Sequence, residues 1–364
     1  MAQQLYFSRD TKVYIEIGSA IWEIPVLDGY SFSQATNASE ITLAEMANSS
    51  GTSRRGRRAF NDSLAPAEWS FSTYVRPFIS AGTGSGAADS AANHHAVEEV
   101  LWALMVGSGA YSTFAFTQGL TSNTSNLTID FDDSNKPTLG TASIYFVLGN
   151  ANKTTYKLSS AVVNEASIDF DIDGLATINW SGFASTLTEA SAPTATIYEK
   201  ITATDNFIRN RLSTLAVDGS ATTGLLSSYN LTLTGGNITI SNNITYITPE
   251  ELGIVNVPVG HVTGTRSISG NFTCYLNNDT SNNDGSTDFW EDISGLSSVV
   301  TNDVSLTFTV GGSTAPKLAI VMPNCHVEVP THDISDVISV TTNFMSLPST
   351  IDDTDEATLT YTGA

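Results

Sequence analysis

The sequence predicts a mainly β protein made of two successive β-rich units. Alternation of apolar and polar residues with a period of two dominates the chain, which is typical of strands that bury one face. Charged residues make up only 14% of the chain, and Ser, Thr, Asn and 27 Gly take their place, which suits strands and turns better than long solvated helices. The order of strand-like segments in the first half also recurs in the second half.

The first half predicts a series of strands and hairpins. Residues 12–17 and 21–26 alternate on either side of the turn Gly18-Ser19, which predicts a hairpin. Asp173-Gly174 is a second hairpin signal, because Gly accepts the positive φ of such a turn. The remaining strands of this half are expected at 30–33, 40–43, 69–75, 143–148, 168–172 and 175–183.

One segment of the first half has the apolar spacing of a helix. Val97, Val100, Leu101 and Leu104 recur three or four residues apart. This spacing predicts a helix over residues 96–105 that ends before Gly107, after a loop rich in Gly, Ala and Ser.

The second half repeats this order of elements. The matched segments are 30–34 with 229–233, 69–71 with 267–275, 98–105 with a short helix at 288–293, 143–148 with 305–310, 167–170 with 325–329, and 175–183 with 337–344. The repeat indicates a tandem duplication, and two unrelated β domains of similar composition are the alternative. Thr, Ala and Ser dominate the junction, so we expect one domain at 1–195, with a loop–helix insertion at 78–140, and a second at 196–364.

The charge of the chain excludes several function classes. The chain has 15 Lys and Arg and 37 Asp and Glu, so its net charge is −22. This charge argues against a surface that binds nucleic acid. A hydrophobic content of 41% is enough to fill a core and argues against disorder. No apolar run is long enough for a membrane helix, and residues 1–6 show no features of a signal peptide.

Two motifs have the residue types of metal sites but lack part of the pattern. Asp169, Asp171 and Asp173, followed by Gly174, match the first half of a calcium loop, but Trp180 stands where the last ligand should be. On a helix, His94 with Glu98 and His95 with Glu99 would form two pairs able to bind zinc, but no third ligand is evident. We therefore expect a solvated acidic hairpin and ordinary residues near a helix start, with no metal and no cofactor.

The other reactive residues give no catalytic pattern. Cys274 and Cys325 are either a disulfide or, as the missing signal peptide favours, two buried thiols. No nucleophile or phosphate-binding motif is present, and the abundance of carboxylates alone does not indicate a glycoside hydrolase. The sequence therefore predicts that the chain is not an enzyme.

The most unusual stretch is a basic cluster between two predicted strands. Arg54, Arg55, Arg57 and Arg58 account for four of the 15 basic residues. On an acidic protein, such a loop has a natural target in the acidic patches of another copy. A solvated loop without a partner is the alternative.

Several blocks resemble the tail tube (major tail) proteins of tailed bacteriophages. The blocks are residues 10–15, 22–34, 61–71 and 207–212, and the likeness is clearest over 10–78. The resemblance implies a small β-barrel or β-sandwich with one flanking helix in each domain, here two in tandem. It also implies that strands of neighbouring subunits join around a channel for DNA. A loop at about 44–66, which holds the four arginines, would reach the adjacent ring.

The resemblance further implies the function and partners of the chain. One domain per subunit usually goes with six-fold rings, so two domains suggest trimeric rings with pseudo-six-fold symmetry, while a six-subunit ring with a peripheral second domain stays open. We expect a structural virion protein, assembled in the host cytoplasm, whose acidic lumen passes DNA without specific binding. Sheath, baseplate and tail terminator proteins are further expected partners. The alternative is a β-rich adhesive or surface-layer module.

Overall fold

The computed structural model describes residues 5–41, 58–131, 139–219, 225–248, 258–278, 282, 284–295, 304–351 and 353–364. Within this part the chain is mainly β, as predicted, and all pairs between named strands are antiparallel. The division into two tandem barrels or sandwiches that meet at residues 195 and 196 stays a prediction.

The named elements follow one another in this order. They are β1 (Thr11–Ile17), β2 (Ala20–Ile24), β3 (Ser31–Glu40), β4 (Ala59–Tyr74), β5 (Pro77–Ile79), β6 (His94–Ala96), α1 (Glu99–Val106), β7 (Tyr111–Ser112), β8 (Ala115–Phe116), β9 (Leu120–Ser122), β10 (Leu127–Asp130), β11 (Ala142–Leu148), β12 (Thr154–Phe170), β13 (Thr177–Ala184), β14 (Thr186–Glu189), β15 (Thr214–Asp218), β16 (Leu233–Ser241), β17 (Thr245–Ile247), β18 (Gly260–Val262), β19 (Ser267–Tyr275), α2 (Ser286–Gly295), β20 (Val304–Val310), β21 (Lys317–Val327), β22 (Thr331–Asp333), β23 (Ser339–Ser346) and β24 (Thr358–Thr362).

The long strand β12 organises the first half. Its N-terminal part pairs with β11 and β14, and its C-terminal part pairs with β13. The strands β2 and β1 extend the sheet from β11, and β4 and β3 extend it from β13. The hairpins predicted at Gly18 and Gly174 are present, and both glycines have a positive φ, of 60° and 94°.

The second half pairs its strands in the same order. Here β21 takes the place of β12: β20 and β24 flank its N-terminal part, and β23 pairs with its end. The strand β15 extends this set from β20, and β19 and β16 extend it from β23. The expected repeat of strand order is therefore seen in the pairing itself.

A shared irregularity aligns the two sets. Ala142 of β11 lies opposite Ala161 of β12, and Val304 of β20 lies opposite Cys325 of β21; a register shift follows directly in both pairings. Ala161 and Cys325 are thus counterparts. Two of the matches made from sequence are wrong: segment 325–329 corresponds to a part of β12 that precedes 167–170, and the strand equivalent to β3 is β16, which begins at Leu233, where the match at 229–233 ends.

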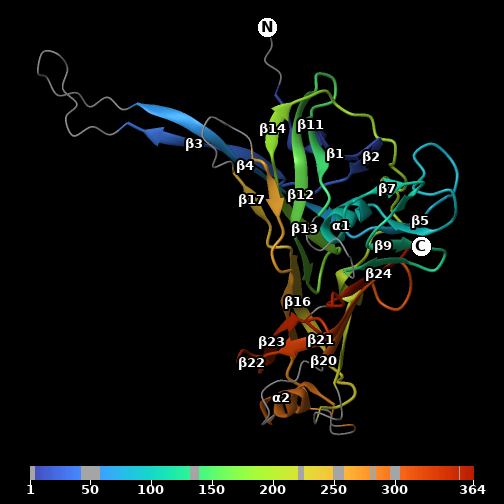
Figure 1. Cartoon of the computed structure of the whole chain (residues 1–364). Helices are drawn as coiled ribbons and strands as arrows, with labels where there is room; N and C mark the ends of the chain where they lie inside the picture. Colours follow the sequence, from blue (N-terminus) through green and yellow to red (C-terminus); the bar gives the residue numbers. More distant parts are fainter. Residues whose placement is uncertain are drawn as a thin grey trace, which may run out of the picture.

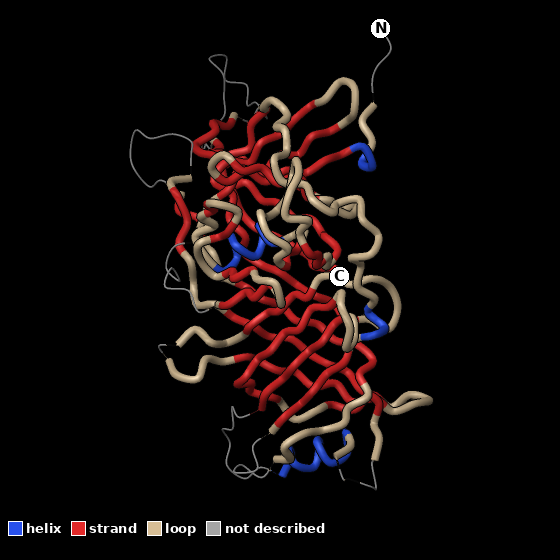
Figure 2. The backbone as a smooth tube through the Cα atoms, turned by 90° about the vertical axis from the view of Figure 1, so that its right-hand side faces the viewer, coloured by secondary structure: helices blue, strands red, loops and turns tan. Residues whose placement is uncertain are grey.

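The two sets of strands form one continuous sheet. The end of β12 pairs with β16 over six residues, from Glu165 opposite Ser241 to Phe170 opposite Gly236. The core continues across this junction, where the rings of Phe170 and Phe308 stack 5.0 Å apart. In Figure 1 these strands run down the middle of the molecule, with α1, β7, β9 and β24 on one side of them and the β3–β4 hairpin reaching out on the other. Figure 2 shows the strands crossing obliquely above α2.

The two helices differ in their surroundings. Every side chain of α1 is buried, whereas α2 buries Ser286, Phe289 and Ile293. The helix expected at 96–105 begins later than predicted, because His94–Ala96 pair with β5 as the strand β6. The short helix expected at 288–293 lies within α2. In the described part of the chain no helix is long and apolar enough to span a membrane.

Candidate assembly surfaces

One face of the continuous sheet is polar over both halves. Alternation along each strand sends Trp69, Ile168, Trp180 and Phe272 into the core and leaves their neighbours on the opposite face. The outward side chains are Ser31, Ser33, Glu68, Ser70, Ser72, Glu165, Ser167, Asp169, Thr177, Asn179, Ser181, Asn237, Thr239, Ser269, Asn271, Thr273, Thr341 and Asn343. We call this set the polar face.

Hydrogen bonds connect the polar face from strand to strand. Ser72 Oγ donates to Asn179 Oδ1 at 2.6 Å, and Asn179 Nδ2 donates to Asp169 Oδ2 at 3.1 Å. On the other side of Asp169, Asn237 Nδ2 donates to the second carboxylate oxygen at 2.6 Å. Further along, Thr273 and Thr341 share a hydrogen bond of 2.9 Å. The face is therefore an ordered lattice of hydroxyls, amides and a few carboxylates.

The polar face carries no positive charge. The strands β3, β4, β13, β16, β19 and β23 and the part of β12 from residue 162 onward contain no Lys or Arg. Glu68, Glu165 and Asp169 are acidic. One end of the face is covered by the β17–β18 hairpin, where the rings of Tyr246 and Phe183 lie 6.5 Å apart. The face is thus weakly acidic and mostly uncharged, and much of the net charge of −22 lies elsewhere.

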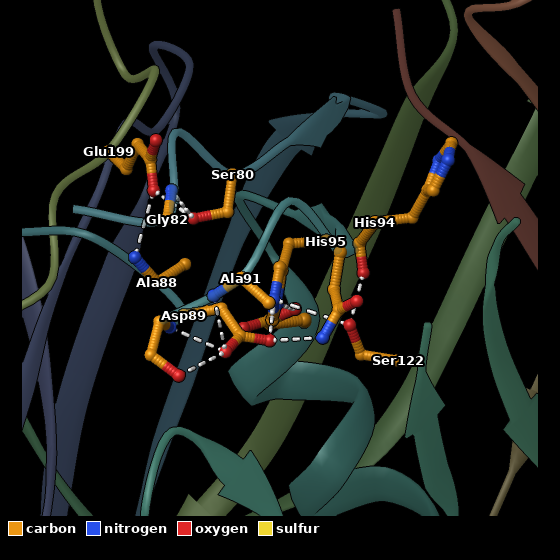
Figure 3. Close-up of polar contacts among 12 residues, drawn as sticks. Ser80, Gly82, Ala88, Asp89, Ala91, His94, His95, Ser122 and Glu199 are labelled. Atoms are coloured by element: carbon orange, nitrogen blue, oxygen red, sulfur yellow. Dashed lines mark hydrogen bonds and ion pairs between the residues drawn. The ribbon is translucent and has the colours of Figure 1, made fainter. Parts of the chain in front are cut away.

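A buried cluster of charged residues fixes the loop that precedes α1. His95 Nδ1 lies 2.8 Å from Glu99 Oε2, and its Nε2 lies 3.4 Å from Asp89 Oδ2 (Figure 3). Burial lowers the pKa of His95, but the ion pairs and hydrogen bonds to these carboxylates outweigh it and raise the pKa to about 9. His95 is therefore a buried cation at neutral pH. His94 points away from the cluster, and its Nδ1 accepts a hydrogen bond from Gly363 N at 2.8 Å.

Arg76 and Glu199 hold the connection between the two halves. The guanidinium of Arg76 donates to the carbonyls of Lys200, Ile201 and Ala203 at 2.8–3.0 Å. Glu199 accepts hydrogen bonds from Ser80 Oγ at 2.8 Å and from the backbone amides of residues 81 and 88 at 2.6 and 2.9 Å (Figure 3). The sequence drew no attention to either residue, although Arg76 is one of few basic side chains and precedes a proline.

Beside this connection lies a buried carboxyl group. Glu98 accepts the backbone amide of Arg76 at 3.2 Å, and burial raises its pKa to about 7. Glu98 and Glu99 therefore have separate partners. The helical placement that the two His–Glu pairs would need is not observed, since His94 and His95 lie in β6, and among the described residues no group of three or more His, Cys, Asp or Glu side chains is placed to hold a metal ion.

The remaining motifs are resolved to different extents. The Asp169–Gly174 string ends β12 and forms a turn, as the hairpin interpretation predicted. Cys274 and Cys325 are buried free thiols, and burial raises the pKa of each to about 12. Of the arginine cluster, Arg54, Arg55 and Arg57 lie outside the described residues. Arg58 is exposed, and its carbonyl accepts Ile41 N at 2.8 Å, which brings the two ends of the long loop together.

Comparison with known proteins places these surfaces in context. No family model matches the chain. The chain is 30% identical over 349 residues to the tail tube protein pb6 of Escherichia phage T5, an alignment that covers 93% of this chain and 70% of pb6. The chain belongs to the phage tail tube proteins.

The alignment with pb6 spans nearly all of this tail tube protein, and so it includes both sets of strands. The resemblance noted in the sequence was clearest over residues 10–78, and the family is confirmed over a far larger part of the chain. The role of the four arginines in this tail tube protein stays a prediction.

Proposed function

We propose that this tail tube protein is a structural virion component that assembles into stacked rings. The rings form a tube through which DNA passes, and three chains build each ring with pseudo-six-fold symmetry. Membership of the tail tube family supports the tube, and the two similarly paired sets of strands support the pseudo-symmetry, since one chain supplies two similar units.

The observation that carries the proposal is the polar face. It extends over both sets of strands, and it combines exposed hydroxyls and amides with carboxylates but no Lys or Arg. Duplex DNA releases counterions when it binds Lys and Arg, so a basic wall would retain it. A wall of hydroxyls and a few carboxylates has no such affinity. We therefore assign the polar face to the channel and the side with α1 to the outside of the tube.

The proposal gives the arginine loop a separate role. The β3–β4 hairpin projects from the body of the chain in Figure 1, and Arg58, which directly precedes β4, is exposed. Its positive charge suits acidic patches on the next ring. Sheath, baseplate and tail terminator proteins would meet the finished tube in the virion, after assembly in the host cytoplasm.

Averaged end-on images and a reconstruction of tubes or tails test the proposal. We expect three chains per ring, a six-fold appearance, and Asp169 on the channel wall. True six-fold symmetry with six chains per ring would contradict the trimer. A channel wall formed by the α1 side would contradict the assignment of the polar face, and failure to find tubes in virions or at high protein concentration would contradict the function itself.

A further inference from the structure

The strand β12 and its counterpart, the run from β21 to β22, differ along one edge. In β12 this edge is covered by β16 from Glu165 to Phe170. Because Ala161 and Cys325 are equivalent, residues 165–170 of β12 correspond to residues 329–334. Residues 331–333 pair with β23 on one side, and among the described strands none pairs with their other edge.

No described strand covers this edge, and Trp290 of α2 contacts it only through a hydrogen bond of 3.2 Å from Nε1 to the Pro330 carbonyl and a ring contact of 5.6 Å with His332. Ile168 and Phe170 are 0% and 5% exposed, because they pack into the core at the junction with β16. Their counterparts, His332 and Ile334, are exposed, and Ile334 has 81% of its surface open to solvent. An isoleucine in this position lacks the partner that its counterpart has.

The strand β3 shows the complementary deficiency. It corresponds to β16. In the first half β3 pairs with β4, which pairs with β13; in the second half β16 pairs with β19, which pairs with β23. Ser31 and Asn237 occupy the same position in these two series of strands. In β16, Ile238 and Ile240 are completely buried, whereas Phe32 and Gln34 of β3 are only partly buried. Among the described strands, β3 pairs with β4 alone.

We propose that β3 of one chain pairs with residues 329–334 of a second copy, in the antiparallel register that β16 and β12 show within one chain. The inference rests on the ring assembly proposed above and specifies which edges close the ring. The register places Ser31 opposite Asp333, Phe32 opposite His332, Ser33 opposite Thr331, Gln34 opposite Pro330, Ala35 opposite Val329 and Tyr30 opposite Ile334.

The side chains at this junction repeat the chemistry of the internal one. Within the chain, Asn237 Nδ2 donates to Asp169 at 2.6 Å and to Ser167 at 2.9 Å. Between chains, Ser31 would meet the equivalent carboxylate and hydroxyl, those of Asp333 and Thr331. Hydroxyl and carboxylate groups that face each other on adjacent strands are a favourable cross-strand pair.

The apolar contact is also repeated. Phe170 stacks on Phe308 at the internal junction. The counterpart of Phe308 is Phe146, on which the ring of Tyr30 stacks at 5.8 Å. Ile334 of the second copy would pack against Tyr30 and lose its exposed surface.

The junction is of the head-to-tail kind that a ring of identical chains requires. Each chain carries one free β3 and one free 329–334 edge, so the contact runs head to tail from chain to chain. Internal and intermolecular junctions then alternate around the ring. Pro330, which has no N–H to donate, makes the free edge a poor template for unspecific strand pairing before assembly.

Disulfide trapping in assembled tubes tests the register. The double variant Ser33→Cys with Thr331→Cys places two facing residues about 5 Å apart, whereas Ser33→Cys with Asp333→Cys places them diagonally at about 7–8 Å. After oxidation, we expect covalent oligomers up to the number of chains in a ring from the facing pair, and roughly tenfold fewer from the diagonal control. The native thiols are buried, which limits background crosslinking.

The outcomes separate this inference from the proposed function. Tubes that crosslink through the diagonal pair as readily as through the facing pair, or through neither, would overturn the register and leave the tube intact. Absence of tubes in the wild type would overturn the proposed function. Hydrogen exchange of wild-type tubes gives a second measurement without substitutions: among residues 31–35, 329 and 331–334, the amides that point away from β4 or β23 should be protected in tubes and exchange faster in the unassembled chain.

Discussion

The end of β12 and residues 329–334 occupy the same place in two similar sets of strands, but only the first has a strand on its outer edge. In β12, Ile168 and Phe170 are buried under β16 and the adjoining core. In the second set, the equivalent residues from Thr331 to Ile334 are all exposed. On their other side the two segments pair with equivalent strands, β13 and β23. The strand β16 on the outer edge of β12 therefore accounts for the difference in exposure.

This comparison shows how a repeated structure reveals its own missing contact. The filled junction supplies the register, the facing residues and the hydrogen bonds that the open one lacks. An exposed apolar residue such as Ile334 would otherwise be unremarkable, because scattered apolar side chains are common on protein surfaces. The burial of its counterpart, Phe170, is what supports a role for Ile334 in the proposed junction.

Replacing the apolar side chain at each junction, Phe170 or Ile334, with Ala should distinguish the two junctions most strongly. Phe170→Ala should destabilise the unassembled chain by about 3–5 kcal/mol, because it leaves a cavity against Phe308. Ile334→Ala should change that stability by less than about 0.5 kcal/mol, since the side chain is exposed before assembly. Denaturant unfolding of the unassembled protein measures both effects.

The same two variants should rank differently in assembly. Ile334→Ala is expected to raise the protein concentration at which tubes form, although it leaves folding unchanged. Normal tube formation by Ile334→Ala would argue against a role for this side chain at the junction. Equal destabilisation of the unassembled chain by the two variants would show that the segments are not in the different environments described above.

Much of the strand order could be predicted from the sequence, because hairpin turns and period-two alternation are local signals. The hairpin at Gly18 and the strand at 143–148 were found in this way. The match of 229–233 to 30–34 was wrong because residue types alone do not fix which strand pairs with which. Only the register shifts at Ala142 and Val304 align the halves correctly.

The surfaces were less predictable than the fold. Net charge suggested an acidic lumen, but it did not identify Asp169 or show that most of the polar face is uncharged. Arg76 and Glu199 were missed, since most of their partners are backbone groups more than 100 residues away that have no sequence signature. The start of α1 was misplaced because β5 recruits His94–Ala96 into a strand.

A second comparison concerns the two helices. The helix α1 lies beside the buried charged cluster formed by Asp89, His95 and Glu99. The pKa of His95 is raised to about 9, so its protonated form stabilises the fold fully below its unfolded pKa of about 6.5, and the stabilisation is lost as pH rises through 9. Between pH 6.5 and 9 the free energy of unfolding should fall by up to about 3 kcal/mol from this group. Denaturant unfolding at pH 6 and pH 9 measures the change.

His95→Gln should flatten this pH dependence, and His326→Gln, at an exposed position on β21, is the matched control. Glu98 adds a slope at lower pH, because its pKa is raised from 4.5 to about 7 and the free energy of unfolding therefore falls as pH rises through that interval. The slope that remains in His95→Gln below about pH 7 therefore reports Glu98. An unchanged slope in His95→Gln would contradict the charged state assigned to His95.

The third comparison is between the two hairpins, and its effect on the folded chain is the smallest. The β3–β4 hairpin carries the arginine cluster. In contrast, β17 and β18 contain no Lys or Arg, and Arg266 is the only such residue among the described residues between β16 and β19. Changing Arg54, Arg55, Arg57 and Arg58 together to Ser should leave unfolding nearly unchanged, since Arg58 is exposed and surface ion pairs contribute roughly 0–1 kcal/mol each. If the loop contacts acidic patches of the next ring, the variant should form normal single rings but short or few tubes, and high salt should shorten wild-type tubes in the same way because it screens the same contacts. The proposed ring junction uses residues 31–35 and 329–334 and not the arginines, so a variant that lost rings and stacks to the same extent would place the arginines in the ring junction and not between rings.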